Sequence, residues 1–307
     1  MRSSAPLAAV VLTYNEQDNL PACLASLRGL DCKLFVVDSG STDCTLALAE
    51  AAGATVLHHA FDNYAAQRNW AQAHLPADAE WVLHLDADER LTAELVSEIN
   101  QVLAGAPVEA DGFLLRKRTI FLGRWMKHGG HYPAYHLRLF RRRLGSCEDR
   151  LYDQHFIVRG RVARLRHDYI DVLTSDLTTW SMRHSRWAEL EAQEITRHEV
   201  VAGTPDRVHP KLFGTPIERR RWLRDRMYGR APLFGRVLLY WFYRYVLRLG
   251  FLDGTEGLIF HFLQGWWYRW LIDSKLYEVR KRQRWPVVSA AEPSTRIPDR
   301  TSEAPTR

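Results

Sequence analysis

The chain has 307 residues, a length that allows one large domain or two smaller ones. Hydrophobic residues make up 46% of it, enough to build a core, and the formal net charge of +6 favours anionic partners such as a nucleotide, a phospholipid surface or a nucleic acid. The four cysteines form no CxxC pair and are expected to be reduced and structural, which favours a cytosolic compartment over a disulfide-rich secreted one.

Short apolar runs alternate with helical patterns through the first hundred residues. The first run, at 7–12, is interpreted as a strand, because it lacks the charged start and the length of a secretion leader. Further strands are expected at 34–37, 56–57 and 81–85. The expected helices cover 19–30, the stretch that ends at Gly53, 63–75 and 92–104. This alternation predicts an α/β fold with a mostly parallel sheet and helices on both faces.

Polar clusters follow three of these strands: TYNE at 13–16, DSGSTD at 38–43 and DADE at 86–89. Because the ends of parallel strands meet at one edge of a sheet, the clusters should line one cleft, where open α/β sheets bind ligands. Each cluster also has an ordinary explanation. Asn15 can cap a helix, the Gly-Ser-Thr-Asp segment suits a turn, and a DxD triplet arises by chance roughly once in a chain of this length.

The DADE cluster carries the candidate metal chemistry. The apolar run before it ends in Asp86, Asp88 and Glu89. Two carboxylates two residues apart at a strand end can share a hard divalent cation and leave positions open for phosphate oxygens. Asp86 and Asp88 are therefore the candidate metal ligands, and Glu89 is expected to start a helix or to support the site. The chain has no GxGxxG or GxxxxGK[ST] loop, which argues against dinucleotide and P-loop sites.

The ordered set of TYNE, DSGSTD, Gln67-Arg68-Asn69 and DADE resembles the family 2 glycosyltransferases, which have the GT-A fold. The resemblance covers about residues 1–170. It implies a Rossmann-like catalytic domain, an inverting mechanism, and Mg²⁺ or Mn²⁺ as cofactor. It also implies roles for single residues. The base and ribose of the donor would lie against Thr13, Asn15, Glu16 and Asp38, and Arg68 would lie near the base or diphosphate. Asp86 would face the ribose and the metal, and Asp88 would ligate the metal.

A strand is expected at 110–118, and a basic stretch from 116 to 147 has nine Lys or Arg, three His and no acid. Such a run is usually a solvated face. Here aromatic residues interrupt it and Gly129-Gly130 provides a bend, which suits a loop that closes on a diphosphate or an anionic acceptor. A half-buried strand is expected around Arg138, and Arg138 and His128 are the candidate phosphate or acceptor contacts.

Glycosyl transfer needs a base to take the proton of the acceptor hydroxyl, and acids return after the basic stretch. That stretch resembles the lipopolysaccharide-core branch of the family, which often has His-Glu near this point, with the Glu as the base. This chain has Asp153-Gln154 instead, and a glutamine cannot accept the proton. Asp153 is therefore the candidate base and Asp149 the alternative. Glu148 and Asp149 can equally balance the charge of the arginines before them.

The last third of the chain predicts helices. Residues 156–170 are interpreted as a hairpin that closes a catalytic domain at 1–170, with a nucleotide-sugar half at 1–115 and an acceptor half at 116–170. A helix capped by Ser175 is expected to run to about 202. The tail at 286–307 is expected to be disordered.

The region 171–285 is expected to contain helices that contact a membrane. Within 219–248, nine Arg stand against one acid, and Arg236, Arg244 and Arg248 share one helical face. Basic residues beside Trp, Phe and Leu suit helices that lie in a bilayer interface, and neither apolar helix has the length to span one. Packing on the catalytic domain or in a dimer is the main alternative, and a re-entrant hairpin is a third.

These features predict an inverting, metal-dependent glycosyltransferase that moves a sugar from a nucleotide-diphospho-sugar, expected to be UDP-linked. The expected acceptor is a lipid-linked or lipopolysaccharide-core saccharide, and the expected location is the cytoplasmic face of a bacterial inner membrane, with no nucleic acid as partner. Two other classes stay open. A nucleotidyltransferase that makes the sugar nucleotide would need a Gly-rich phosphate loop, and a non-catalytic membrane-surface or nucleic-acid-binding protein has no motif in its support.

Overall fold

The computed structural model describes residues 6–105, 109–200 and 208–284. Within these ranges, nine strands form one sheet in the order β3-β2-β1-β4-β8-β6-β11-β5, and β7 pairs with β6. The bounds of these strands are β1 Leu7–Thr13, β2 Cys32–Asp38, β3 Thr55–His58, β4 Trp81–Asp86, β5 Glu89–Leu91, β6 Gly112–Phe121, β7 Arg124–Trp125, β8 Ala134–Arg141 and β11 Val162–Leu173.

The sheet is mostly parallel, as predicted. Strands β3, β2, β1 and β4 are mutually parallel, β8 is antiparallel to β4 and β6, and β11 runs parallel to β6. The strand order reverses between β1 and β4. In open α/β sheets this switch point is where ligands bind, outside the carboxyl ends of the strands.

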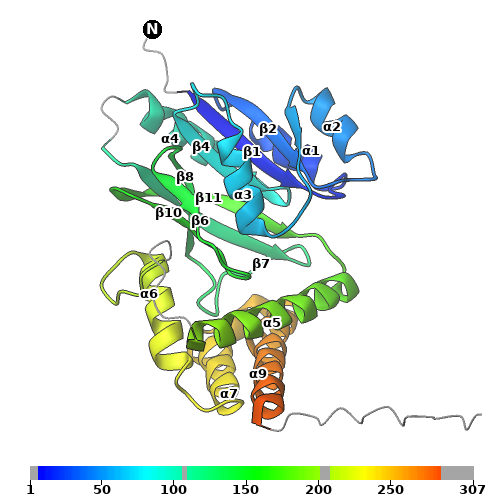
Figure 1. The fold of residues 1–307 in the computed structure, drawn as a ribbon, viewed down its shortest axis with the longest axis vertical. Helices are drawn as coiled ribbons and strands as arrows, with labels where there is room; N and C mark the ends of the chain where they lie inside the picture. Colours follow the sequence, from blue (N-terminus) through cyan, green and yellow to red (C-terminus); the bar gives the residue numbers. More distant parts are fainter. Residues whose placement is uncertain (1–5, 106–108, 201–207, 285–307) are drawn as a thin grey trace, which may run out of the picture.

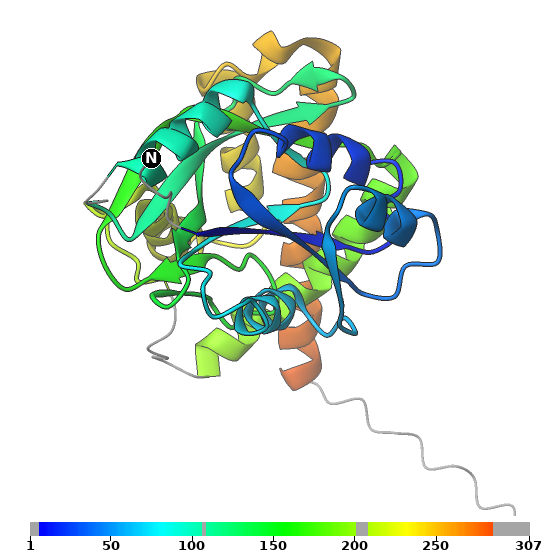
Figure 2. The ribbon, with the colours of Figure 1, turned by 90° about the horizontal axis from the view of Figure 1, so that it is seen from above.

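Helices cover both faces of the sheet. The side chains of β1 point alternately toward one face and the other, and each set contacts different helices. Leu7, Ala9 and Val11 point into a core shared with α1 Leu20–Ser26, α2 Thr45–Ala51 and α4 Ala93–Ala104. Ala8 and Val10 point the other way, into a core shared with α3 Tyr64–Ala73. Figure 2 shows α1 and α3 on opposite sides of β1. The expected α/β class is confirmed.

Two local predictions in this half are wrong. Residues 156–170 do not form a hairpin, because β10 Phe156–Val158 pairs with β9 Gly145–Cys147 in a separate two-stranded sheet, whereas β11 joins the main sheet. Of the two roles expected for Glu89, the start of a helix is wrong, whereas its pairing with Arg138 and its hydrogen bond from Asp86 N fit a supporting role. Glu89 begins β5, and the next helix is capped by Thr92, whose hydroxyl accepts a hydrogen bond from Leu95 N at 3.3 Å.

The chain beyond the sheet is helical, and in Figure 1 its helices lie together below the sheet. The first of them is capped by Asp176 and not by Ser175, since Asp176 Oδ1 accepts from Thr178 N at 2.8 Å. The helical segments are α5 Leu177–Val200, α6 Pro216–Leu223, η1 Arg224–Tyr228, α7 Gly235–Phe242, η2 Tyr243–Leu247, η3 Gly250–Asp253, α8 Gly254–Phe260, η4 His261–Trp267 and α9 Tyr268–Arg284.

These helices pack on one another and on the sheet. Ala188 and Ala192 of α5 bury Tyr268, Ile272 and Leu276 of α9. No helix among the described residues is long and apolar enough to cross a membrane. The predicted domain boundary at residue 170 stays a prediction, and the tail expected at 286–307 lies outside the described residues.

Candidate active site

The carboxyl ends of β1, β2 and β4 bring the three polar clusters together. Thr13, the last residue of β1, is paired in register with Asp38 at the end of β2, and Leu12 is paired with Asp86 at the end of β4. Each strand is mostly buried in its last few residues before its polar cluster begins, and the side chains that follow emerge at the same edge.

Asp38 organises the first two clusters. Its carboxylate accepts hydrogen bonds from Thr13 Oγ1 at 3.0 Å and from the backbone N of Gly40 and Ser41 at 2.9 Å each. Burial raises the pKa of Asp38, but the hydrogen bonds from Ser41, Gly40 and Thr13 outweigh burial and hold that pKa below its ordinary value. Asp38 is therefore ionised and fixed in place.

The TYNE and DSGSTD loops are joined by hydrogen bonds in both directions. Asn15 N donates to Ser41 Oγ at 2.8 Å, and Thr42 N donates to Asn15 Oδ1 at 2.8 Å. Asn15 has a φ of 53°, a left-handed conformation that asparagine tolerates better than most residues. Glu16 N donates to Thr45 Oγ1 at 2.8 Å, and burial raises the pKa of the Glu16 carboxyl. Together the two loops form one rigid rim.

Asp86 is held by two buried arginines. Arg68 Nη2 lies 2.9 Å from Asp86 Oδ1, and Arg138 Nη2 lies 2.9 Å from Asp86 Oδ2. Arg138 also pairs with Glu89, whose other oxygen accepts from Asp86 N at 3.0 Å. Burial raises the pKa of Asp86, but Arg68 and Arg138 outweigh it and keep that pKa well below its usual range. Both arginines are thus engaged with protein carboxylates, and their predicted contacts with the donor stay predictions.

Asp88 has the opposite environment. Its side chain forms no hydrogen bond or ion pair with the residues that the structure describes. Burial raises the pKa of Asp88 well above its usual range, and the carboxylates of Asp171, Asp86, Glu89 and Glu16 raise it further. A half-buried carboxylate among like charges is a group that a bound cation would stabilise.

The donor set fits a divalent cation that is bound together with a nucleotide. In the described part of the chain, no three His, Cys, Asp or Glu side chains are arranged to hold a metal ion by themselves. Mg²⁺ in nucleotide sites takes one or two carboxylates and fills its other positions with phosphate oxygens and water. Asp88, with Asp86 beside it, would supply that part of the coordination, and the role of both as metal ligands stays a prediction.

Asp171 is a neighbour that the sequence did not reveal. It lies on β11, where it pairs with Glu89 of β5, and Val172 N donates to Asp88 O at 3.0 Å. Asp171 accepts from Lys117 Nζ at 2.7 Å. Nothing local in the sequence marks it, because only the order of the strands brings β11 to the DADE cluster.

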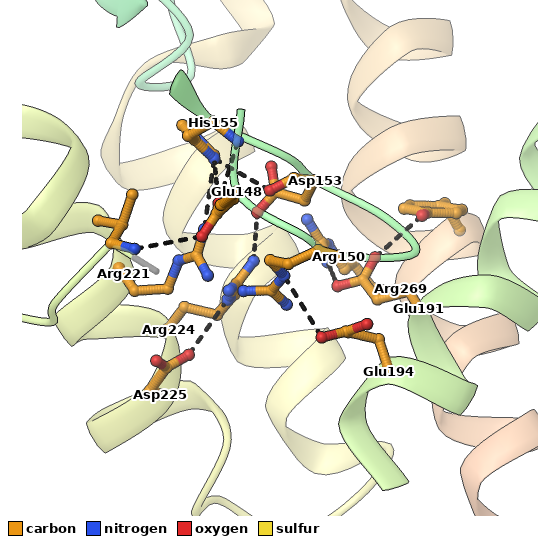
Figure 3. A network of polar contacts seen from close by, with 12 residues as sticks. Glu148, Arg150, Asp153, His155, Glu191, Glu194, Arg221, Arg224, Asp225 and Arg269 are labelled. Atoms are coloured by element: carbon orange, nitrogen blue, oxygen red, sulfur yellow. Dashed lines mark hydrogen bonds and ion pairs between the residues drawn. The ribbon is translucent and has the colours of Figure 1, made fainter. Parts of the chain in front are cut away.

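The predicted acceptor side forms a second cluster, drawn in Figure 3. The loop at 148–155 lies between helices of the last third of the chain, and ion pairs join it to them. Glu148 is buried and accepts from Arg221 Nη2 at 2.7 Å and from His155 N at 3.0 Å. Arg150 lies 3.6 Å from Glu194 of α5. The loop is therefore fixed by the helical region.

Asp153, the candidate base, lies at the exposed edge of this cluster. Its φ of 56° is left-handed, a conformation that aspartate, like asparagine, tolerates better than most residues. Its carboxylate pairs with Arg224 of η1. Burial raises its pKa, but His155, Arg224 and Arg150 outweigh burial and lower the pKa of Asp153 to about 2. Asp153 is therefore ionised at neutral pH, as a base must be.

Of the remaining predicted residues, Asp149 lies within this loop and His128 lies between β7 and β8. Asp149, the alternative base, is exposed. His155 lies just before β10, with its Nδ1 3.0 Å from Asp153 O. His128 Nδ1 lies 2.6 Å from Asp253 Oδ1, and His128 N donates to Asp253 Oδ2 at 2.9 Å. The predicted roles of Asp149 and His128 stay predictions.

Comparison with known proteins decides the family. Residues 8–164, about half of the chain, match the family described as Glycosyl transferase family 2. The chain belongs to this family. The match covers the clusters at the strand ends and the loop with Asp153, so the resemblance carried by TYNE, DSGSTD and DADE is confirmed, and the glycosyltransferase class is favoured over the nucleotidyltransferase and non-catalytic alternatives.

Curated relatives agree with the family. The lipopolysaccharide core biosynthesis glycosyltransferase LpsC of Rhizobium meliloti is 26% identical over 269 residues, which cover 84% of this chain and 90% of LpsC. An uncharacterized glycosyltransferase of Rickettsia conorii is 37% identical over 98 residues, or 32% of this chain and 34% of that protein. The matched part thus spans about a third of the length of the Rickettsia relative.

Solved structures of glycosyltransferases resemble the chain more distantly. The mannosyltransferase PcManGT of Pyrobaculum calidifontis, in complex with GDP-Man and Mn²⁺, has a TM-score of 0.46 at 16% identity and covers 92% of this chain and 87% of its own. TarS 1–349 of S. aureus, in complex with UDP-GlcNAc, has a TM-score of 0.43 at 14% identity and covers 91% of both chains.

Proposed function

We propose that this family 2 protein is an inverting, metal-dependent glycosyltransferase that uses a nucleotide-diphospho-sugar with UDP as its nucleotide. The observation that carries the proposal is the state of Asp88. It stands at the carboxyl end of β4, beside the switch point of the sheet, among carboxylates that raise its pKa and without a polar partner among the described residues. A site of this kind is complementary to a cation carried by a diphosphate.

The nucleotide would lie along the rim formed by TYNE and DSGSTD. Asp38 and the Asn15 loop are rigid before any ligand binds, so little entropy is lost when they contact a base and ribose. Asp88, with Asp86 beside it, would hold Mg²⁺ or Mn²⁺. When bound, this ion neutralises charge on the departing diphosphate. Arg68 and Arg138 keep Asp86 ionised and oriented.

Asp153 would act as the base. The acceptor hydroxyl oxygen forms a bond to the anomeric carbon as the bond from that carbon to the diphosphate breaks. The hydroxyl proton passes to Asp153, and the nucleoside diphosphate leaves with the bonding electrons. In-line attack of this kind inverts the anomeric centre. The helical region supports the step, because Arg224 and the contacts of Glu148 hold the loop that carries Asp153.

The proposed acceptor is a lipid-linked or lipopolysaccharide-core saccharide, and the proposed place of reaction is the cytoplasmic face of a bacterial inner membrane. Similarity to LpsC over most of both chains supports this class of acceptor. The helical region from 219 to 285 is the part of the chain proposed to contact the membrane.

The test is a screen of nucleotide sugars for transfer or hydrolysis with Mg²⁺ and with Mn²⁺. Asp88→Ala should abolish both transfer and metal-dependent nucleotide binding, while Asp78→Ala, which removes an exposed acid at the other end of β4, should change neither. Asp153→Asn should abolish transfer and leave donor binding intact. Unchanged turnover in Asp88→Ala would refute the metal site, and unchanged turnover in Asp153→Asn would transfer the role of base to Asp149.

A further inference from the structure

The helix formed by α7 and η2 has its polar and apolar sides reversed. Arg236, Val237 and Arg244 are buried. The side chains on its other side are exposed to between 37% and 71%, and none of them is charged: Leu238, Leu239, Phe242, Tyr243, Val246 and Leu247. A surface helix normally buries its apolar stripe and exposes its charges. This one exposes the stripe.

The arginines of this helix are used inside the protein. Arg236 Nε donates to Asp273 Oδ1 at 3.0 Å, and both side chains are buried. Arg244 Nε donates to Gly129 O at 3.0 Å, and Arg244 Nη2 lies 3.1 Å from His131 Nδ1. These contacts fix the rotation of the helix, because turning it outward would leave Asp273 buried without its partner. The apolar side is therefore held toward the outside.

The apolar surface continues around the turn that follows. Leu249, Phe251 and Leu252 are exposed, and Leu249 has a φ of 59°. Leu122 is exposed as well, and it occupies the β6–β7 turn, in which Leu122 and Gly123 have φ values of 48° and 79°. Two-residue turns with two positive φ values favour Asn-Gly. At Leu122 and Leu249 the chain accepts backbone strain and exposes a leucine.

The strand β7 that follows the turn at Leu122 contacts the start of α8, directly after Leu252 and Asp253 in the chain. Arg124 Nη1 lies 3.5 Å from Glu256 Oε2 of α8, and a side-chain carbon added at Gly254 would approach Arg124 to 2.7 Å. Beneath the surface, Phe121 packs on Phe260 with ring centroids 5.2 Å apart. We call the exposed set the apolar corner. It consists of Leu122, Leu238, Leu239, Phe242, Tyr243, Val246, Leu247, Leu249, Phe251 and Leu252.

The charges around the apolar corner are positive. Arg124, Lys127 and Arg248 are exposed next to it in the chain. The acids between residues 235 and 262 are Asp253, which is buried, and Glu256, which faces Arg124. An apolar surface with a cationic rim is complementary to the acyl chains and anionic headgroups of a bilayer. A second copy of the chain fits less well, because a symmetric contact would bring the two cationic rims together.

We propose that the apolar corner inserts into the interface of an anionic bilayer, with Arg124, Lys127 and Arg248 at the level of the lipid phosphates. Insertion would bring a lipid-linked acceptor to the site, and this purpose rests on the proposed function. The corner is also connected to the acceptor side, since Gly129 N donates to Arg248 O at 2.9 Å and His128 is bonded to Asp253.

The test is flotation of the full chain with phosphatidylcholine vesicles, with and without phosphatidylglycerol, and without donor or acceptor. The wild type should float with the vesicles that contain phosphatidylglycerol, and less so at high salt. The double variant Leu239→Glu/Leu247→Glu should lose about tenfold or more of this binding. Met182→Glu is the matched control, because Met182 is an equally exposed apolar side chain on α5, outside the corner. It should bind as the wild type does.

Thermal unfolding shows whether the variants are folded, and transfer to a soluble saccharide shows whether the site is intact. Wild-type protein that does not float, or a double variant that floats as well as the wild type, would overturn the proposal. So would a wild-type dimer that the double variant converts to monomers, because a second copy would then cover the corner. Vesicle binding without any transfer would instead refute the proposed function and leave this inference standing.

Discussion

Asp88 illustrates how a single residue can be unfavourable for the fold and suited to a ligand. Burial and then Asp171, Asp86 and Glu89 raise its pKa, so the folded protein holds this proton more tightly than the unfolded chain does. The stability linked to Asp88 is therefore fully present below its ordinary pKa and is lost as the pH rises through the folded-state value. At neutral pH this group therefore destabilises the protein until a cation binds.

Asp88→Asn should accordingly stabilise the metal-free protein while it removes nucleotide binding. We expect the Tm at pH 7 in the presence of EDTA to rise by about 1–3 °C, because the amide abolishes repulsion among buried carboxylates. The rise should shrink toward pH 4, where the wild-type carboxyl is protonated. Circular dichroism melts measure both effects, with Asp18→Asn at an exposed position as control. A lower Tm at pH 7 would mean that Asp88 has an attractive partner.

Arg138, unlike Asp88, stabilises the fold. It is buried and pairs with Asp86 and Glu89, so its removal leaves the buried Glu89 carboxylate without a cation, while Asp86 keeps Arg68. Breaking a buried pair in this way costs about 3–5 kcal/mol. Arg138→Ala should therefore lower the free energy of unfolding by that amount in urea denaturation, whereas Arg143→Ala, at an exposed position, should change it by less than about 0.5 kcal/mol. Equal losses in the two variants would contradict the central role of the Arg138 pair.

At the scale of elements, the sequence predicted what depends on neighbours in the chain. Apolar runs that end in polar clusters located β1, β2 and β4, and the helical spacing located α3 and α4. The predictions from the sequence failed where a strand pairs with a segment far away in the chain. Strand β10 pairs back to β9, and β11 crosses to β6, so residues 156–170 only resembled a hairpin. Asp171 could not be predicted for the same reason, because only the order of the strands brings it close to Asp88.

The β6–β7 turn offers a test in which stability and binding should change in opposite directions. Leu122 has a φ of 48°, which a leucine adopts only under strain and an asparagine adopts readily. Leu122→Asn should therefore raise the free energy of unfolding by about 0.5 kcal/mol or more, and it should weaken vesicle flotation. Leu177→Asn, at another exposed leucine, should not stabilise the protein. If Leu122→Asn were destabilising, the exposed leucine would be packed in a way that its exposure does not show.

At the scale of the whole molecule, the helical region is joined by ion pairs to the loop that carries the candidate base. The sequence suggested a separable membrane-associated tail, because its arginines lie on one face and its apolar residues elsewhere. In the structure Arg236 and Arg244 of that face are buried, whereas Arg248 is exposed. Arg236 pairs with Asp273, Arg221 pairs with Glu148, and Arg224 pairs with Asp153. No local pattern distinguishes an arginine that meets lipid from one that meets a buried carboxylate, since the partner lies far away in the chain.

The ion pair of Arg224 and Asp153 joins the helical region to the candidate base, and its effect on the pKa of Asp153 can be measured (Figure 3). Arg224 is one of the positive neighbours that lower the pKa of Asp153 to about 2, so Arg224→Gln should raise that pKa toward the ordinary value near 4. The acidic limb of kcat/KM should then move to higher pH, by about one unit, with a smaller change at pH 8. Arg226→Gln, a nearby exposed position, is the control. An Arg224→Gln profile that falls uniformly at all pH values would mean that Arg224 only holds the loop and that Asp153 is not the base.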